Sequence, residues 1–184
     1  ATSSFVQLLV GLFVGLCSGA GVIIAQSFGA GDHDEVNRQV HTALALAIAG
    51  GAALTVIGLL ISRPVLRLMQ TPDEIVGMAS EYLQIYFLGM IPQMIYNMGT
   101  NILRAVGDSK GPLYFLIVAS IVNIVLDIVL VAVIPLGVAG AAIATVASQV
   151  VSAVLTVRCI HGSQGMQWHL QLKNIRIERS VLLA

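Results

Sequence analysis

The chain has 184 residues, with nine Lys and Arg balancing nine Asp and Glu, so its formal net charge is +0. Hydrophobic residues make up 57% of it and charged residues only 10%, and the mean hydropathy is +0.92. Soluble domains carry roughly 25% charged residues, so this composition excludes an ordinary soluble domain. The zero net charge gives no reason to expect a nucleic-acid partner. The composition indicates an all-α, polytopic membrane protein.

Five apolar stretches are long enough to cross a membrane, which takes roughly 20 residues each. We expect transmembrane helices at residues 5–28, 40–62, 82–103, 112–134 and 137–160. Small residues let helix backbones approach closely in membranes. The glycines predicted to be such packing positions are Gly11, Gly15 and Gly19 on the first span and Gly50, Gly51 and Gly58 on the second. Pro92 removes a backbone donor inside the third span and should bend that helix near its middle.

Lys and Arg are unevenly divided between the two sides of the membrane. Seven follow the first, third and fifth spans, and two follow the second. The positive-inside rule therefore predicts that the chain starts outside the plasma (inner) membrane and ends in the cytoplasm. We expect residues 1–162 to form part of an N-terminal transmembrane lobe and residues 163–184 to form a cytoplasmic connector and the start of the next helix. The first residues have no initiator Met and no signal-peptide features, which suggests a fragment whose preceding span is missing.

Three of the spans carry polar side chains at helical spacing. Side chains three or four residues apart share one face of a helix, and lipid cannot satisfy polar groups. The positions expected to line a shared interior are Gln93, Asn97 and Asn101 on the third span, Ser120, Asn123 and Asp127 on the fourth, and Thr145, Ser148, Gln149 and Ser152 on the fifth. Hydrogen bonding between helices is the alternative role for the third-span residues.

Asp127 is the one charged side chain between Lys110 and Arg158. An ionisable group at membrane depth is costly and by default marks an ion or substrate pathway. The oxygens of Asn123, Asp127 and Thr145 suit a hard cation such as Na⁺, and the carboxylate equally suits H⁺. An intramembrane aspartyl protease would need a pair of acids, so it is disfavoured. The histidines lack ligand spacing and the glycine-rich loops lack phosphate-loop spacing, so neither a metal site nor ATP use is expected.

Four motifs in order resemble those of the multidrug and toxic compound extrusion (MATE) family. They are Gln-Ser-Phe-Gly-Ala-Gly-Asp at 26–32, Ile-Leu-Arg-Ala-Val-Gly-Asp-Ser-Lys-Gly-Pro at 102–112, Asn-Ile-Val-Leu-Asp at 123–127 and Leu-Gly-Val-Ala-Gly-Ala-Ala-Ile-Ala-Thr at 136–145. The resemblance covers nearly the whole chain and corresponds to helices two to six of a two-lobe, twelve-helix transporter. The first helix and the C-terminal lobe would then be partners supplied by the same protein.

The resemblance also implies a function. Members of this family export organic, often cationic, drug-like compounds by antiport and are not enzymes. Asn123, Asp127 and Thr145 look like the positions that hold Na⁺ or take up H⁺ in the N-terminal lobe, and no cofactor beyond this coupling ion is implied. A lipid-linked oligosaccharide flippase of the same superfamily is the alternative. Such a flippase should carry Arg and Lys in its cavity, and none lies clearly inside a span.

Overall fold

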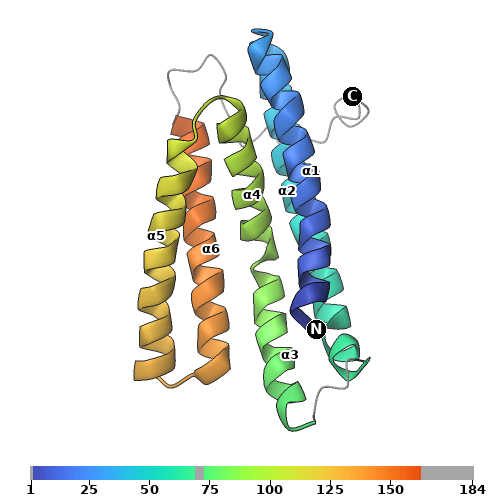
Figure 1. Ribbon diagram of the computed structural model, residues 1–184, viewed down its shortest axis with the longest axis vertical. Coiled ribbons are helices and arrows are strands. Elements are labelled where there is room, and N and C mark those ends of the chain that lie inside the picture. The colour runs from blue at the N-terminus through green and yellow to red at the C-terminus, as the bar shows by residue number, and fades with distance from the viewer. Residues whose placement is uncertain (1, 69–72, 163–184) are drawn as a thin grey trace.

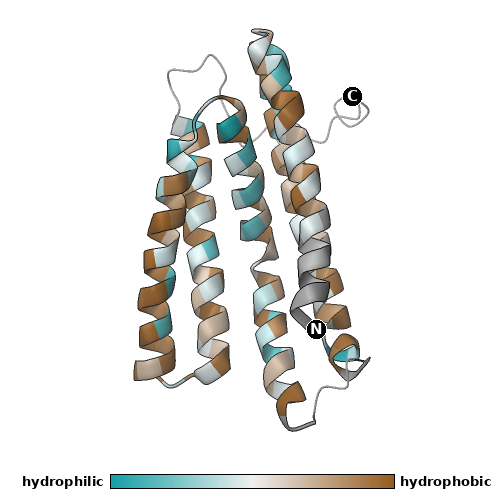
Figure 2. Cartoon of the chain, in the orientation of Figure 1, coloured by the Kyte–Doolittle hydropathy of each residue, from teal (hydrophilic) through white to brown (hydrophobic). Residues whose placement is uncertain are grey.

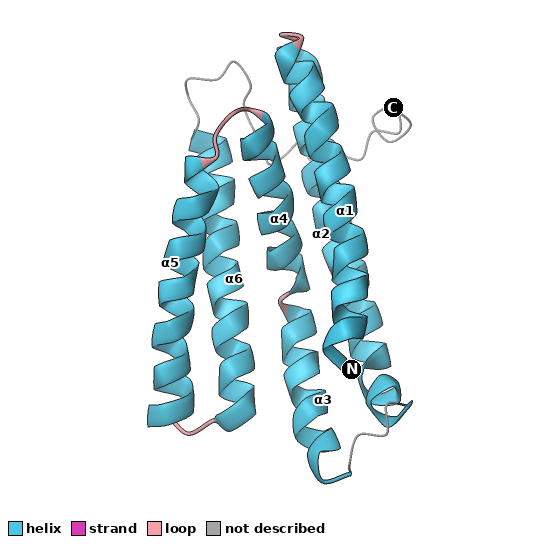
Figure 3. Cartoon of the chain, in the orientation of Figure 1, coloured by secondary structure: helices cyan, strands magenta, loops and turns pink. Residues whose placement is uncertain are grey.

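The structure, a computed structural model, describes residues 2–68 and 73–162. Every secondary-structure element in these ranges is helical, as Figure 3 shows, which confirms the all-α prediction. The elements are α1 (Thr2–Gly29), α2 (His33–Leu68), α3 (Asp73–Leu88), α4 (Met90–Ala105), α5 (Lys110–Asp127), the π-helix η1 (Ile128–Val133) and α6 (Gly137–Gly162). The connector predicted at residues 163–184 lies outside the described residues.

Helix α4 stands in the middle of the bundle, with α1 and α2 on one side and α5 and α6 on the other (Figure 1). A cluster of buried apolar side chains joins α1, α2, α3 and α4, and Ile160 of α6 belongs to it as well. Helix α5 packs mainly on α6 and buries only Pro112 and Ala119. The outer face of α5 is exposed and strongly apolar (Figure 2), a surface suited to lipid.

The five predicted spans correspond to α1, α2, α3 with α4, α5 with η1, and α6. Three boundaries were wrong: α2 begins at His33 rather than at residue 40 and continues through Pro64 to Leu68, and the third span begins at Asp73 rather than at residue 82. Hydropathy had assigned these charged stretches to a loop, although charged side chains near helix ends can extend toward water. Three described segments are long and apolar enough to cross a membrane, namely His33–Leu66, Lys110–Val133 and Gly137–Gly162.

The third span is broken in its middle, as Pro92 predicted. Helix α3 ends at Leu88, α4 begins at Met90, and Gly89 lies between them (Figures 1 and 3). Pro92 falls in the first turn of α4, where a missing N–H costs no helical hydrogen bond. On the α2 side, the hydroxyl of Thr55 lies 2.8 Å from the carbonyl oxygen of Phe87 and 2.9 Å from that of Gly51, and its one hydrogen can donate to Phe87. A neighbouring helix thus satisfies a helix-end carbonyl that lipid cannot.

Replacing Thr55 with valine is expected to destabilise the bundle by about 1 kcal/mol, because the Phe87 carbonyl loses its donor while side-chain volume is kept. The measurement is the thermal unfolding midpoint of the purified protein in detergent. Thr55→Ser keeps the hydroxyl and serves as the control, so it should unfold closer to the wild-type midpoint. Equal losses in both variants would mean that the methyl group, and not the hydrogen bond, is what matters here.

The glycines of the second span pack as predicted. A Cβ atom placed on Gly51 would lie 2.7 Å from the Cα atom of Ile91, so the backbones of α2 and α4 touch at the break. Gly58 faces the ring of Phe87, and Gly50 likewise lies against an aromatic ring. These positions therefore have no room for a side chain.

The first-span glycines meet no other helix among the described residues, so close packing at these positions stays a prediction. Among the described residues, no heavy atom lies within 4 Å of a Cβ placed on Gly11, Gly15 or Gly19. Helical spacing shows that the three share a face, but it does not show which neighbour that face meets. In the structure this face of α1 borders an open groove.

Candidate functional site

The polar faces of α4, α5 and α6 meet around a cavity of about 260 Å³. Its lining residues are Gln93, Tyr96, Asn97, Leu116, Ala119, Ser120, Asn123, Thr145, Ser148, Gln149 and Ser152. The structure therefore brings together all the residues predicted to face this interior except Asn101 and Asp127. The lining is neutral, with amide and hydroxyl groups on three helices and one aromatic ring.

Asp127 lies one helical turn beyond Asn123, at the point where α5 becomes the π-helix η1. It is not part of the cavity lining. Its Oδ1 atom is buried and has no hydrogen-bond partner among the described residues, and the same holds for Nδ2 of Asn123. A buried polar atom without a partner costs about 1–3 kcal/mol, and π-helical turns are frequent at functional sites. The carboxylate of Asp127 and the amide of Asn123 can therefore each bind a further group.

Thr145 brings a third oxygen to this end of the bundle, from α6. Its hydroxyl donates to the carbonyl of Ala141 at 2.9 Å, which uses its only hydrogen. The oxygen keeps its lone pairs for an acceptor or ligand role on the cavity wall. A carboxylate, an amide carbonyl and a hydroxyl are the donor types that Na⁺ prefers, and the carboxylate alone can hold H⁺. The residues therefore fit either cation in type.

Gln149 connects the cavity to the break in the third span. Its Nε2 atom donates to Oε1 of Gln93 at 3.4 Å, and both side chains line the cavity. Its own Oε1 atom lies against Gly89, where a Cβ atom would collide with it. The break thus lets α6 approach the backbone of the third span. The sequence signal that could have found Gly89 is a glycine three residues before Pro92.

Asn101 was expected on the cavity wall but lies at the contact between α4 and α1. Its Cβ atom is 3.2 Å from a Cβ placed on Gly21, and its Nδ2 donates to the carbonyl of Asn97 at 2.9 Å. Each step of four residues turns a helix by 400°, about 40° past a full turn. Two such steps move Asn101 roughly 80° away from Gln93, onto the α1 side.

A bundle of apolar helices around a neutral polar cavity, with a carboxylate beside it whose Oδ1 atom is buried without a partner among the described residues, is typical of a membrane transporter. The comparison with known proteins identifies which kind. The family model MatE matches residues 1–129, and the chain belongs to this family, whose members are transporters and not enzymes.

Two curated relatives come from Bacillus subtilis (strain 168). The probable multidrug resistance protein YoeA is 36% identical over 157 residues, covering 82% of this chain and 34% of that protein. The probable multidrug resistance protein YpnP is 36% identical over 152 residues, covering 80% and 33%. A crystal structure of MATE in the bent conformation superposes with a TM-score of 0.87 at 28% identity, covering 95% of this chain and 39% of that one. The chain thus spans about a third of the length of these relatives.

Proposed function

We propose that the protein containing this chain is a secondary transporter of the plasma membrane that exports organic, often cationic, compounds in exchange for Na⁺ or H⁺. The observation that carries this proposal is the buried Oδ1 atom of Asp127, which has no partner among the described residues. A carboxylate that binds a cation on one side of the membrane and releases it on the other can couple export to an ion gradient. Two lobes that open alternately to either side would provide that exposure.

Asn123 and Thr145 complete the coupling site in this proposal. Asn123 lies one turn from Asp127 on the same helix and can turn its amide oxygen toward a shared cation. Thr145 contributes its hydroxyl oxygen from α6, across the cavity. Binding of the coupling ion would therefore draw α5 and α6 together at this end of the bundle.

The cavity lining supports the proposed substrate class. Its amide and hydroxyl oxygens accept hydrogen bonds, and the ring of Tyr96 can interact with a cation through its face. No Arg or Lys is among the described lining residues, whereas a lipid-linked oligosaccharide would bring phosphates that need cationic partners. The cavity therefore favours an organic cation over the flippase substrate.

In the proposed orientation, the loops between α1 and α2 and between α4 and α5 face the cytoplasm.

The test is transport by the full-length protein in proteoliposomes under a Na⁺ gradient or an H⁺ gradient imposed separately. We expect efflux of a fluorescent organic cation under one of the two gradients, and that gradient identifies the coupling ion. Vesicles without protein give the background rate. Movement of a fluorescent lipid-linked oligosaccharide, without gradient-driven efflux of the dye, would contradict the proposal and favour the flippase.

A further inference from the structure

Helix α5 stands at the edge of the bundle and presents a long apolar stripe away from it (Figures 1 and 2). The stripe consists of exposed side chains spaced three or four residues apart, namely Tyr114, Ile117, Ile121, Ile124 and Ile128. Such spacing keeps them on one face of the helix. The cavity meets a different side of α5, at Ser120 and Asn123. The stripe is therefore separate from the candidate functional site.

Lys110 continues this stripe at the end where α5 begins. It is the first residue of the helix and is exposed. Because it precedes Tyr114 by four residues and Ile117 by seven, all three share one face. Tyr114 is 64% exposed. Lysine and tyrosine side chains near the end of a span extend to the level of the lipid headgroups, so the stripe runs from headgroup level into the apolar part of the membrane.

A second cation, Arg158, lies near Lys110 on the neighbouring helix and is exposed. Helices α5 and α6 pack against each other and run in opposite directions (Figure 1). A Cβ atom placed on Gly140 of α6 would lie 3.0 Å from the carbonyl oxygen of Leu130, so this side of α6 faces η1. Arg158 follows Gly140 by 18 residues, which is five full turns and about 27 Å. Lys110 precedes Leu130 by 20 residues, or about 30 Å. The two cations therefore lie at nearly the same depth.

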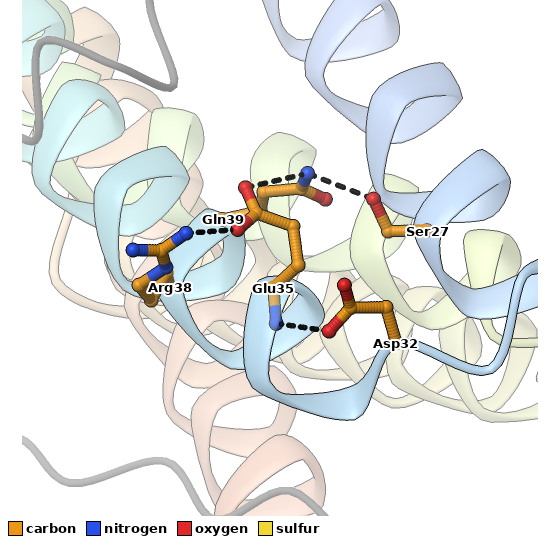
Figure 4. Close-up of polar contacts among 5 residues, drawn as sticks. All are labelled: Ser27, Asp32, Glu35, Arg38 and Gln39. Carbon is orange, nitrogen blue, oxygen red and sulfur yellow. Dashed lines mark hydrogen bonds and ion pairs between the residues drawn. The ribbon is translucent and has the colours of Figure 1, made fainter.

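Neither of these cations is paired with a carboxylate among the described residues. Arg38, on α2 at the same end of the bundle, forms an ion pair with Glu35 (Figure 4), but no described ion pair includes Lys110 or Arg158. Asp108 is already engaged, since its Oδ1 atom accepts two backbone N–H groups at the start of α5, at 3.0 and 2.9 Å. Its negative charge is offset there by the positive end of the helix dipole. Two exposed cations beside an apolar stripe thus lack an anion.

We propose that this edge of the bundle binds an anionic phospholipid such as phosphatidylglycerol. The phosphate lies between Lys110 and Arg158, and an acyl chain lies along the stripe below Tyr114. A zwitterionic lipid brings an ammonium group that the two cations repel, so the site prefers a headgroup with net negative charge. A free phosphate ion would meet the same cations but gain nothing from the stripe. The proposal does not depend on the transported substrate or the coupling ion.

The test is native mass spectrometry of the full-length protein, stripped of lipid in detergent and titrated with phosphatidylglycerol or with phosphatidylcholine of the same acyl chains. We expect phosphatidylglycerol to bind more tightly. The double variant Lys110→Gln/Arg158→Gln should weaken its binding roughly thirtyfold, which corresponds to about 1 kcal/mol for each cation. Binding of phosphatidylcholine should not weaken. Both side chains are exposed, so the double variant should still fold.

Arg63→Gln is the matched control for the double variant. Arg63 is also an exposed cation, but it lies near the other end of the bundle, on α2. Its loss should leave the affinity for phosphatidylglycerol at the wild-type value. Equal affinities of the wild type for the two lipids, or equal losses in Arg63→Gln and the double variant, would overturn the proposal. Full displacement of the lipid by inorganic phosphate at the same concentration would show a free-anion site and would also overturn it.

A photoreactive phosphatidylglycerol tests where the acyl chain lies. Its diazirine is placed midway along the acyl chain, and the full-length protein is labelled in membranes and analysed by peptide mass spectrometry. We expect labels on α5 between residues 114 and 124, and excess phosphatidylglycerol should reduce them more than excess phosphatidylcholine does. Labels on other segments with none on α5 would mean that something else covers the stripe. Equal competition by the two lipids would mean that α5 contacts bulk lipid only, and either result would contradict the proposal.

Discussion

Replacing Asp127 with asparagine is expected to reduce gradient-driven export by the full-length protein to the level of vesicles without protein. Asparagine has nearly the same size and can take the same place at the junction of α5 and η1. It cannot ionise, so it can neither release a proton nor neutralise a bound Na⁺. Without an ionisable side chain at position 127, the ion gradient can no longer drive export. Efflux in proteoliposomes gives the export rate, and dye fluorescence polarisation gives substrate binding, which should persist.

Asp34→Asn is the matched control for this experiment. Asp34 is also a single carboxylate on a helix, but it is exposed in the first turn of α2 and away from the cavity. Its neutralisation should leave gradient-driven export close to the wild-type rate. If Asp127→Asn also exports at the wild-type rate, Asp127 is a structural acid and the coupling ion binds elsewhere in the protein.

Hydropathy predicted which segments form helices, because the bilayer requires long apolar stretches with satisfied backbones. It was less informative about where those helices end. Charged residues at 63 and 81 indicated loops, yet the helical backbone continues through both positions. Pro92 correctly predicted a bend, since its effect on the backbone is local and independent of neighbours. The hydroxyl of Thr55 that supports the bend comes from another helix, and no local pattern indicates that pairing.

Helical spacing predicted most of the residues that line the cavity. It shows which residues share a face but not which helix covers that face. Ser148 and Gln149 reached the cavity, whereas Asn101 had turned far enough to meet α1. The π-helical turn after Asp127 was not predicted, because the aliphatic residues 128–133 look the same in an α-helix and a π-helix. That turn nevertheless directly follows Asp127, the acid of the proposed coupling site.

Replacing Gly51 with alanine is expected to destabilise the protein by about 1–3 kcal/mol, the usual cost of forcing extra atoms into a packed interior. The added methyl group would lie 2.7 Å from the Cα atom of Ile91 and 3.2 Å from the carbonyl oxygen of Met90. Both are backbone atoms, so no side-chain rotation can relieve the contact and α2 must move away from α4. The measurement is the thermal unfolding midpoint in detergent.

Gly77→Ala separates this packing effect from the general effect of replacing a helical glycine. Gly77 lies in α3, is exposed, and has no described heavy atom within 4 Å of an added Cβ. Alanine there should stabilise the helix by roughly 0.5–1 kcal/mol, because it restricts the unfolded chain and meets nothing in the folded one. The two substitutions should therefore shift the midpoint in opposite directions. If Gly51→Ala raised the midpoint as Gly77→Ala is expected to do, α2 and α4 would not be held at this close distance. The break in the third span, and with it the position of Gln93 in the cavity wall, would then need another explanation.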